Sequence, residues 1–257
     1  MLRHPGERGT RPGGPPFPQP FARLIGEQKR ELALLSAYSL ERLARVFRGV
    51  GFRCDRCARC CTRSFNGHVL LLDDDVEQVG AIDRMSMEPV PSYDFSDQEG
   101  TFYTSGYTIR AIPDREGSCW FLEGGLCRIY EKRPMVCRVY PYMLHREPDE
   151  RGKVDWRQIS GLDLHGEYHS PLSLEESLDL AALTKAFEVR ALLHEIAFLE
   201  CTGMHFLVNG LRYARKARDD RLHRLRRGED AVVMVYHRGR FEPWHVGEGG
   251  RATRPFV

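Results

Sequence analysis

The stretch FRCDRCARCCTR, residues Phe52–Arg63, carries cysteines at the spacing C-x2-C-x2-C-C. Thiols repeated every third residue along a tight loop can converge on one point, while backbone N–H groups turn toward the sulfur atoms. That geometry serves zinc and iron–sulfur clusters alike, so the stretch predicts a metal centre that organises the chain around it. Its candidate ligands are Cys54, Cys57, Cys60 and Cys61.

Three further cysteines, Cys119, Cys127 and Cys137, follow at the spacing C-x7-C-x9-C. Seven thiols exceed the four ligands of one tetrahedral zinc or one [4Fe–4S] cluster, and fall one short of two all-cysteine sites. Which of the seven bind metal stays open. A second site would need a His, an Asp or the distant Cys201, which ends an apolar helical stretch and is more simply explained as a core residue.

Two alternatives bear on this cluster. Cys60 and Cys61 are adjacent, and side chains of an extended segment alternate between its two sides, so we expect them not to bind the same mononuclear ion. Alternatively, the cysteines could form disulfides or a redox-active site and bind no metal. The odd number of clustered cysteines and the lack of an export signal argue against it.

Three stretches together resemble the YkgJ-like cysteine cluster family, whose members carry a zinc- or iron-chelating CxxCxxCC domain. They are FRCDRCARCCTR (Phe52–Arg63), LLLDDDVEQV (Leu70–Val79) and CWFLEGGLCRIYEKRPMVCRVYPYM (Cys119–Met143). The resemblance covers roughly Gly51 to Gly161 and implies a metal centre on the matching positions. These are Cys54, Cys57, Cys60, Cys61, Cys119, Cys127 and Cys137.

The resemblance also bears on the kind of metal centre. A related domain occurs in flagellin lysine N-methylases, which resemble iron–sulfur proteins, and this favours an iron–sulfur cluster, first of all [4Fe–4S], over zinc. Many family members carry a later cysteine before a Pro-Gly turn. The corresponding stretch here, Gln158–Leu162, has none, which favours one principal centre.

The third stretch holds other side chains of interest. Arg133 and Pro134 predict the start of a helix or tight turn that carries Cys137. Arg138 either offsets the charge of a thiolate-bound centre or forms an ordinary surface ion pair. Three tyrosines are expected to pack over the centre, namely Tyr130, Tyr140 and Tyr142.

The chain as a whole predicts an α+β fold: a small irregular cysteine-rich metal-binding core with short strands, flanked by an N-terminal helix and a C-terminal helical segment. We expect a disordered leader over residues 1–20 and the metal-binding domain with its N-terminal helix over residues 21–165. Residues 166–257 would form a helical segment with a terminal β-hairpin that packs on the core.

Within these regions, apolar periodicity predicts helices and alternation predicts strands. The expected helices are Glu31–Phe47, a helix through Val76, Val79 and Ile82, one from a capping box at Ser173 to about Glu200, and 204–226. The expected strands and hairpins are 68–72, a hairpin over 102–112, a turn over 119–130 with Gly124-Gly125 at its tip, 154–159, and a C-terminal hairpin turning at 237–240.

Weaker signals have simpler explanations. His165 and His169 are predicted to be exposed in a loop, although a role as an extra ligand stays open. Asp73–Asp75 are predicted to cap a helix rather than bind a cation. The basic residues of Arg212–Arg227 have almost no interleaved aromatics, so a solvated helix face is favoured over a nucleic-acid groove.

Composition limits the function classes. With 42% hydrophobic and 29% charged residues the chain is typical of a globular protein, and its net charge of +2 predicts neither nucleic acid nor an acidic surface as partner. No apolar run approaches the roughly 18 residues that span a bilayer. Because the N-terminus lacks the apolar stretch of a secretory signal, we expect a cytoplasmic protein without a membrane segment.

Three functional hypotheses remain. The first is a metal-binding protein whose iron–sulfur centre is structural or transfers electrons. The second is a zinc-stabilised interaction module whose basic helix meets an unidentified protein partner. The third is a cluster-containing enzyme similar to a protein lysine N-methyltransferase. No catalytic or organic-cofactor residue can be assigned, because the sequence holds no C-x3-C-x2-C, no nucleotide-binding Gly-rich loop and no G-x-S-x-G.

Overall fold

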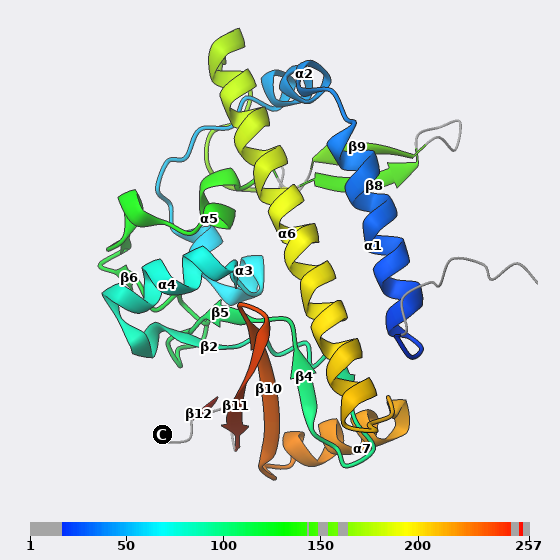
Figure 1. The fold of residues 1–257 in the computed structure, drawn as a ribbon. Coiled ribbons are helices and arrows are strands. Elements are labelled where there is room, and N and C mark those ends of the chain that lie inside the picture. Colours follow the sequence, from blue (N-terminus) through cyan, green and yellow to red (C-terminus); the bar gives the residue numbers. More distant parts are fainter. Residues whose placement is uncertain (1–16, 143, 149–153, 159–163, 248–251, 254–257) are drawn as a thin grey trace, which may run out of the picture.

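A long helix, α6 (Leu174–Val208), crosses the molecule, and the other elements are arranged around it (Figure 1). It begins at the predicted capping box, in which Ser173 Oγ accepts a bond from the Glu176 N–H at 3.0 Å and Glu176 Oε2 accepts one from the Ser173 N–H at 2.8 Å. The mixture of helices and short strands confirms the α+β class. The computed structural model describes residues 17–142, 144–148, 154–158, 164–247 and 252–253.

Part of α6 is long and apolar enough to span a bilayer, judged by length and composition alone. This differs from the expectation that no apolar run approaches that length, because the second half of α6, residues 191–208, carries only Glu195 and Glu200 as acidic or basic residues other than histidine. The helices α1 (Phe21–Ser36), α2 (Leu40–Val50) and α5 (Met135–Val139) pack against it. The core helix of a globular protein has the same length and composition.

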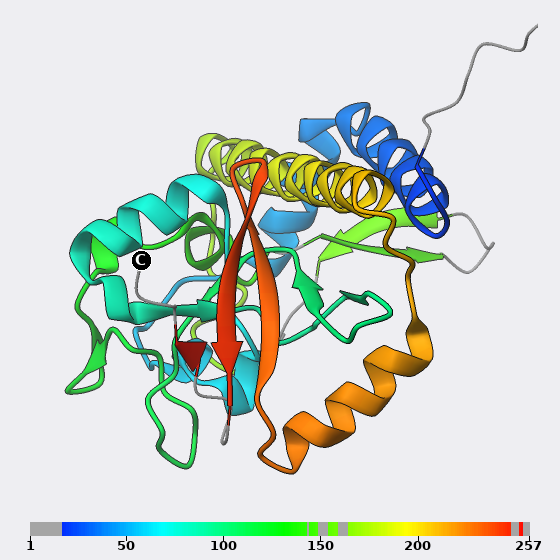
Figure 2. The same ribbon diagram turned by 60° about the horizontal axis from the view of Figure 1, so that its bottom comes forward.

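The predicted N-terminal helix is two helices, α1 (Phe21–Ser36) and α2 (Leu40–Val50). The chain bends between them because Ser39 takes extended backbone angles and caps α2, its Oγ accepting from the Arg42 N–H at 3.3 Å. Both helices pack against α6 (Figures 1 and 2). Gly51 ends α2 in the left-handed conformation, as a C-terminal glycine does.

Gly51 and Gly49 offer a matched test of this helix end. A Cβ at Gly51 (φ 56°) would meet the Ser170 carbonyl oxygen, whereas a Cβ at Gly49 meets nothing within 4 Å. We expect Gly51→Ala to destabilise the protein by more than about 1 kcal/mol, and Gly49→Ala, inside the helix, to stabilise it by about 0.5–1 kcal/mol. Denaturant midpoints measure both changes, and shifts of the same sign would contradict this account.

The predicted C-terminal hairpin is present as β10 (Ala231–His237) and β11 (Arg240–Val246). It belongs to a sheet of order β12-β11-β10-β4-β3, in which β4 runs parallel to β10 with Phe102 opposite Val233. The hairpin is therefore hydrogen-bonded into a sheet with strands from the cysteine-bearing half of the chain (Figure 2). The remaining strands of this sheet are β3 (Phe95–Ser96), β4 (Phe102–Thr104) and β12 (Ala252–Thr253).

The prediction of a hairpin over residues 102–112 is wrong. β4 pairs with β10 and β3, whereas β5 (Tyr107–Ile109) lies in a second sheet of order β1-β5-β2. The chain changes direction at Gly106, whose φ of 155° lies at the edge of the range that side-chain-bearing residues avoid. Tertiary pairing with the distant β10 thus overrides the local hairpin pattern. The partners of β5 are β1 (Leu70–Leu71) and β2 (Met87–Pro89).

The apolar core that joins these sheets is formed by buried residues from α4, β4, β5 and β10, among them Val79, Phe102, Ile109 and Val233. The helix α4 (Asp73–Ile82) begins at the predicted aspartates. Residues 84–99 form the 3-10 turn Arg84–Ser86, the two short strands β2 and β3, and the irregular segments between them. A hairpin with Gly124-Gly125 at its tip is confirmed as β6 (Leu122–Glu123) and β7 (Leu126–Cys127).

The remaining elements complete the chain. The predicted strand at 154–159 is β9 (Val154–Gln158), paired antiparallel with β8 (Leu144–Pro148). The second C-terminal helix is shorter than predicted, α7 (Arg215–Arg226), because α6 continues to Val208. The leader expected over 1–20 lies outside the described residues up to residue 16, and Phe17 packs against the cluster around Phe21.

Candidate metal centre

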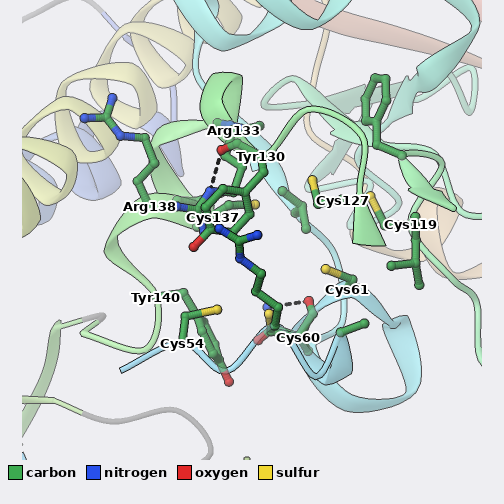
Figure 3. A pocket seen from close by; sticks show the side chains of 18 of the residues that line it. Cys54, Cys60, Cys61, Cys119, Cys127, Tyr130, Arg133, Cys137, Arg138 and Tyr140 are labelled. Carbon is green, nitrogen blue, oxygen red and sulfur yellow. Dashed lines mark hydrogen bonds between the residues drawn. The ribbon is translucent and has the colours of Figure 1, made fainter. Parts of the chain in front are cut away.

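All seven clustered cysteines line one cavity of about 470 Å³. Figure 3 shows the sulfur atoms of Cys61, Cys119 and Cys127 pointing toward the same space, with Cys54, Cys60 and Cys137 around it. Every cysteine of the chain is a free thiol in the structure. Segments far apart in the sequence are thus gathered by the fold at one place, as a metal centre requires.

The first cysteine segment is an irregular loop that leads into a single 3-10 turn, Arg59–Cys61. Arg56 and Ala58 have positive φ angles of 60° and 61°, so the chain coils tightly between the thiols. Cys60 and Cys61 lie on the turn rather than in an extended segment. The expectation that they face opposite sides is therefore wrong, and both line the cavity.

Backbone hydrogen bonds tie the second cysteine segment to the first. The Cys119 N–H donates to the Cys61 carbonyl oxygen at 2.7 Å, and an antiparallel bridge joins Thr62 to Ser118. Cys127 is the last residue of β7, and the hairpin carries it back to the cavity. Cys137 lies on the short helix α5 (Met135–Val139), which begins after Pro134 as predicted.

The thiols interact strongly with one another. A hydrogen bond with Cys60 lowers the pKa of Cys61 to about 7, aided by the charge of Arg133, and the same bond raises the pKa of Cys60. Burial raises the pKa of Cys119 to about 11, and neighbouring thiols add to the effect. Burial likewise raises the pKa of Cys127 and of Cys137. Cys61 lies within electrostatic reach of all of these thiols.

Arg133 is a cation at this cavity that could not be assigned to the centre from the sequence, where Arg138 was the candidate. The Arg133 guanidinium lies 3.7 Å from the centre of the Tyr130 ring, and that of Arg56 lies 4.3 Å from it. Arg133 Nε also donates to the Tyr130 carbonyl oxygen at 2.8 Å. Arg138 is exposed and only borders the cavity. The pairing of Tyr130 with two guanidinium groups depends on the fold, so no local sequence signal could have found it.

A comparison with known protein families also points to metal binding. Residues 53–159 match a family model described as "CxxCxxCC: Putative zinc- or iron-chelating domain". This part of the chain is therefore similar to CxxCxxCC domains. The match confirms the resemblance seen in the sequence and supports metal binding. No curated protein and no solved structure matches the chain.

The predicted tyrosines of residues 53–159 line the cavity. Tyr142 is fully buried, and its hydroxyl oxygen accepts a bond from the Phe52 N–H at 2.8 Å. Its ring stacks on Phe47 of α2 at 4.2 Å between centroids. Tyr142 therefore fixes the start of the first cysteine segment against the N-terminal helices.

The seven clustered thiols surround a volume and do not converge on a point. Within the described ranges, no three Cys, His, Asp or Glu side chains stand close enough together to hold a single metal ion. A tetrahedral zinc needs four donors at about 2.0–2.3 Å from one point. The arrangement thus has the donors that zinc or iron requires, spread over the walls of a wider cavity.

Two other candidate ligand groups, Cys201 and Asp73–Asp75, lie outside the cysteine cavity. Cys201 lies outside the cavity, among the apolar residues around Phe198, and its thiol is 3.6 Å from the Gly239 carbonyl oxygen, which confirms the core assignment. Asp73–Asp75 form the first turn of α4, where Asp75 accepts bonds from the backbone of Leu72 and Met135. Asp75 therefore caps the helix, while Asp74 forms ion pairs with Arg190 and Arg238.

The two histidines behave differently, and one expectation is corrected. Both lie in a loop as predicted, and His169 is exposed. His165 is buried, with 8% of its surface exposed, and it lines the same cavity as the cysteines.

Most basic residues of α7 are exposed, while Arg218 donates to the Tyr93 carbonyl oxygen at 2.7 Å.

Proposed function

We propose that residues 53–159 hold an iron–sulfur cluster in the cysteine cavity, with a structural or electron-transfer role in the cytoplasm. One observation carries the proposal: seven free thiols from three separate parts of the chain line a single cavity. Thiols are kept free in a reducing compartment, and thiolates are the ligands that iron–sulfur clusters take from proteins.

The shape of the cavity favours a polynuclear cluster over a single zinc ion. A zinc ion would draw four sulfur atoms to one point. A cluster is wider, because its own sulfide ions bridge the irons and the protein thiolates bind at its corners. Donors spread over the walls of a cavity of about 470 Å³ suit the second case better.

The walls of the cavity also suit a thiolate-bound cluster. Arg133 lies close enough to Cys61, Cys127 and Cys137 to offset negative charge. Apolar and aromatic side chains such as Phe121 and Ile129 complete the walls. When bound, an iron–sulfur cluster supplies reversible one-electron transfer, and its hydrogen bonding and solvent exposure set the reduction potential.

Anaerobic purification of the full chain tests the proposal. We expect a brown protein with stoichiometric iron and acid-labile sulfide, visible sulfur-to-iron charge-transfer absorption, and an electron paramagnetic resonance signal in one of its redox states. Cys201→Ser is the control that leaves all of these unchanged. A colourless protein with stoichiometric zinc would favour the zinc-stabilised module instead, and one without iron or zinc would refute metal binding.

A further inference from the structure

The segment that carries His165 is bound to the start of the first cysteine loop. An antiparallel bridge joins Arg53 to Glu167, with N–H···O distances of 2.8 and 3.0 Å in the two directions. The Arg59 guanidinium donates to the Leu164 carbonyl oxygen at 2.9 Å. These contacts on both sides of His165 fix its segment against the first cysteine loop, although more than a hundred residues separate the two in the sequence.

Gly166 shows how closely the two segments approach. Its φ is +68°, and a Cβ there would meet the ring of Phe52 and lie 3.1 Å from the Arg53 carbonyl oxygen. Only glycine fits both the conformation and the space. The backbone beside His165 is therefore pressed against the residues that precede Cys54.

The His165 ring lies at the cavity wall among aromatic rings. Its centroid is 4.8 Å from that of Phe65, 5.3 Å from that of Tyr140 and 5.7 Å from that of Phe52. Both ring nitrogens are buried. In either neutral tautomer one of them offers a lone pair, which is the form in which imidazole binds metals.

We propose that His165 supplies a nitrogen ligand to the metal centre, as an eighth protein donor beside the seven thiols of the cavity. The inference rests on the proposed function, since it needs a metal in this cavity.

A histidine ligand would change the properties of the centre. Neutral imidazole adds no negative charge where a thiolate adds one, and histidine-ligated [2Fe–2S] centres have higher reduction potentials than all-cysteine ones.

The alternative is that His165 only packs against its aromatic neighbours, and two substitutions separate these roles. His165→Phe keeps an aromatic ring and removes the nitrogen donor, whereas His165→Cys removes the ring and restores a metal-binding donor. His169→Phe is the matched control, because it makes the same change four residues away on an exposed side chain.

The experiment measures iron, zinc and sulfide per chain in the anaerobically purified full-length proteins, with X-ray absorption at the edge of the metal found. We expect a nitrogen scatterer in the wild type and in His169→Phe. His165→Phe should lose it together with at least half of the metal, and His165→Cys should regain metal with sulfur-only coordination.

Two outcomes would overturn the inference, and they can be told apart. A wild type with no iron or zinc would remove the proposed function and this ligand with it. A metal-loaded wild type whose His165→Phe variant keeps full metal content and the same spectrum would leave the proposed function standing and reduce His165 to a packing residue.

Discussion

Cys61→Ser is expected to remove more than half of the bound metal and to lower the melting temperature by at least about 10 °C. Cys61 has the central position among the thiols: it is hydrogen-bonded to Cys60 and lies within electrostatic reach of Cys119, Cys127 and Cys137. Serine keeps the size of the side chain but is a poor ligand for zinc and iron. Metal analysis and thermal unfolding measure the two effects.

The loss of stability should be local. The cysteine loops contain little regular structure, and Cys54 and Cys57 are exposed, so bound metal supplies much of what holds these loops. Among the described residues, the core around Phe206 shares no side chain with the metal cavity and should persist. We therefore expect faster amide exchange over residues 52–68 and 117–142 than over α6. Cys201→Ser is the control, and a Cys61→Ser protein with unchanged metal and melting temperature would contradict this role.

Phe206→Ala is expected to cost about 3–5 kcal/mol and to leave the metal content unchanged. Phe206 is fully buried near the end of α6, with its ring centroid 5.1 Å from that of Phe21 and 5.0 Å from that of Tyr103. It joins α1, α6 and β4, so truncation opens a cavity where three elements meet. The melting temperature should fall by roughly 10 °C.

Val208→Ala provides the control for this variant. Val208 lies on the last turn of the same helix with 74% of its surface exposed, and its truncation should change stability by no more than about 0.5 kcal/mol. Among the described residues, the cluster around Phe206 contributes no side chain to the metal cavity. Loss of metal in Phe206→Ala would therefore show that the two regions are coupled more tightly than their separation suggests.

Local sequence patterns predicted the elements that local interactions stabilise. The capping box at Ser173, the glycine that ends α2 and the turn at Gly124-Gly125 each depend on a few neighbouring residues. The predicted hairpin around Gly106 failed because β4 forms its hydrogen bonds with β10, far along the chain. The single helix predicted over 31–47 failed because Ser39 caps a second one.

The residues of the candidate site could likewise be predicted only in part from the sequence. Its seven cysteines could be identified from their spacing and the family resemblance, because metal ligation demands particular residue types. Arg133 beside Cys61 was not predicted, and His165 was only left open as an extra ligand, since histidine and arginine are common in loops and only their surroundings distinguish them. The structure also placed Cys60 and Cys61 on one turn, where both face the cavity.

The sequence alone determined that residues 53–159 are similar to a CxxCxxCC domain and that the fold is α+β, because thiol spacing, capping residues and apolar periodicity are local properties of the chain. Only the tertiary structure decided which distant segments meet: β4 with β10, Arg53 with Glu167, and the cysteines in one cavity. The physical reason is that such contacts are selected by burial and hydrogen bonding across the whole fold, and short stretches of sequence do not encode them.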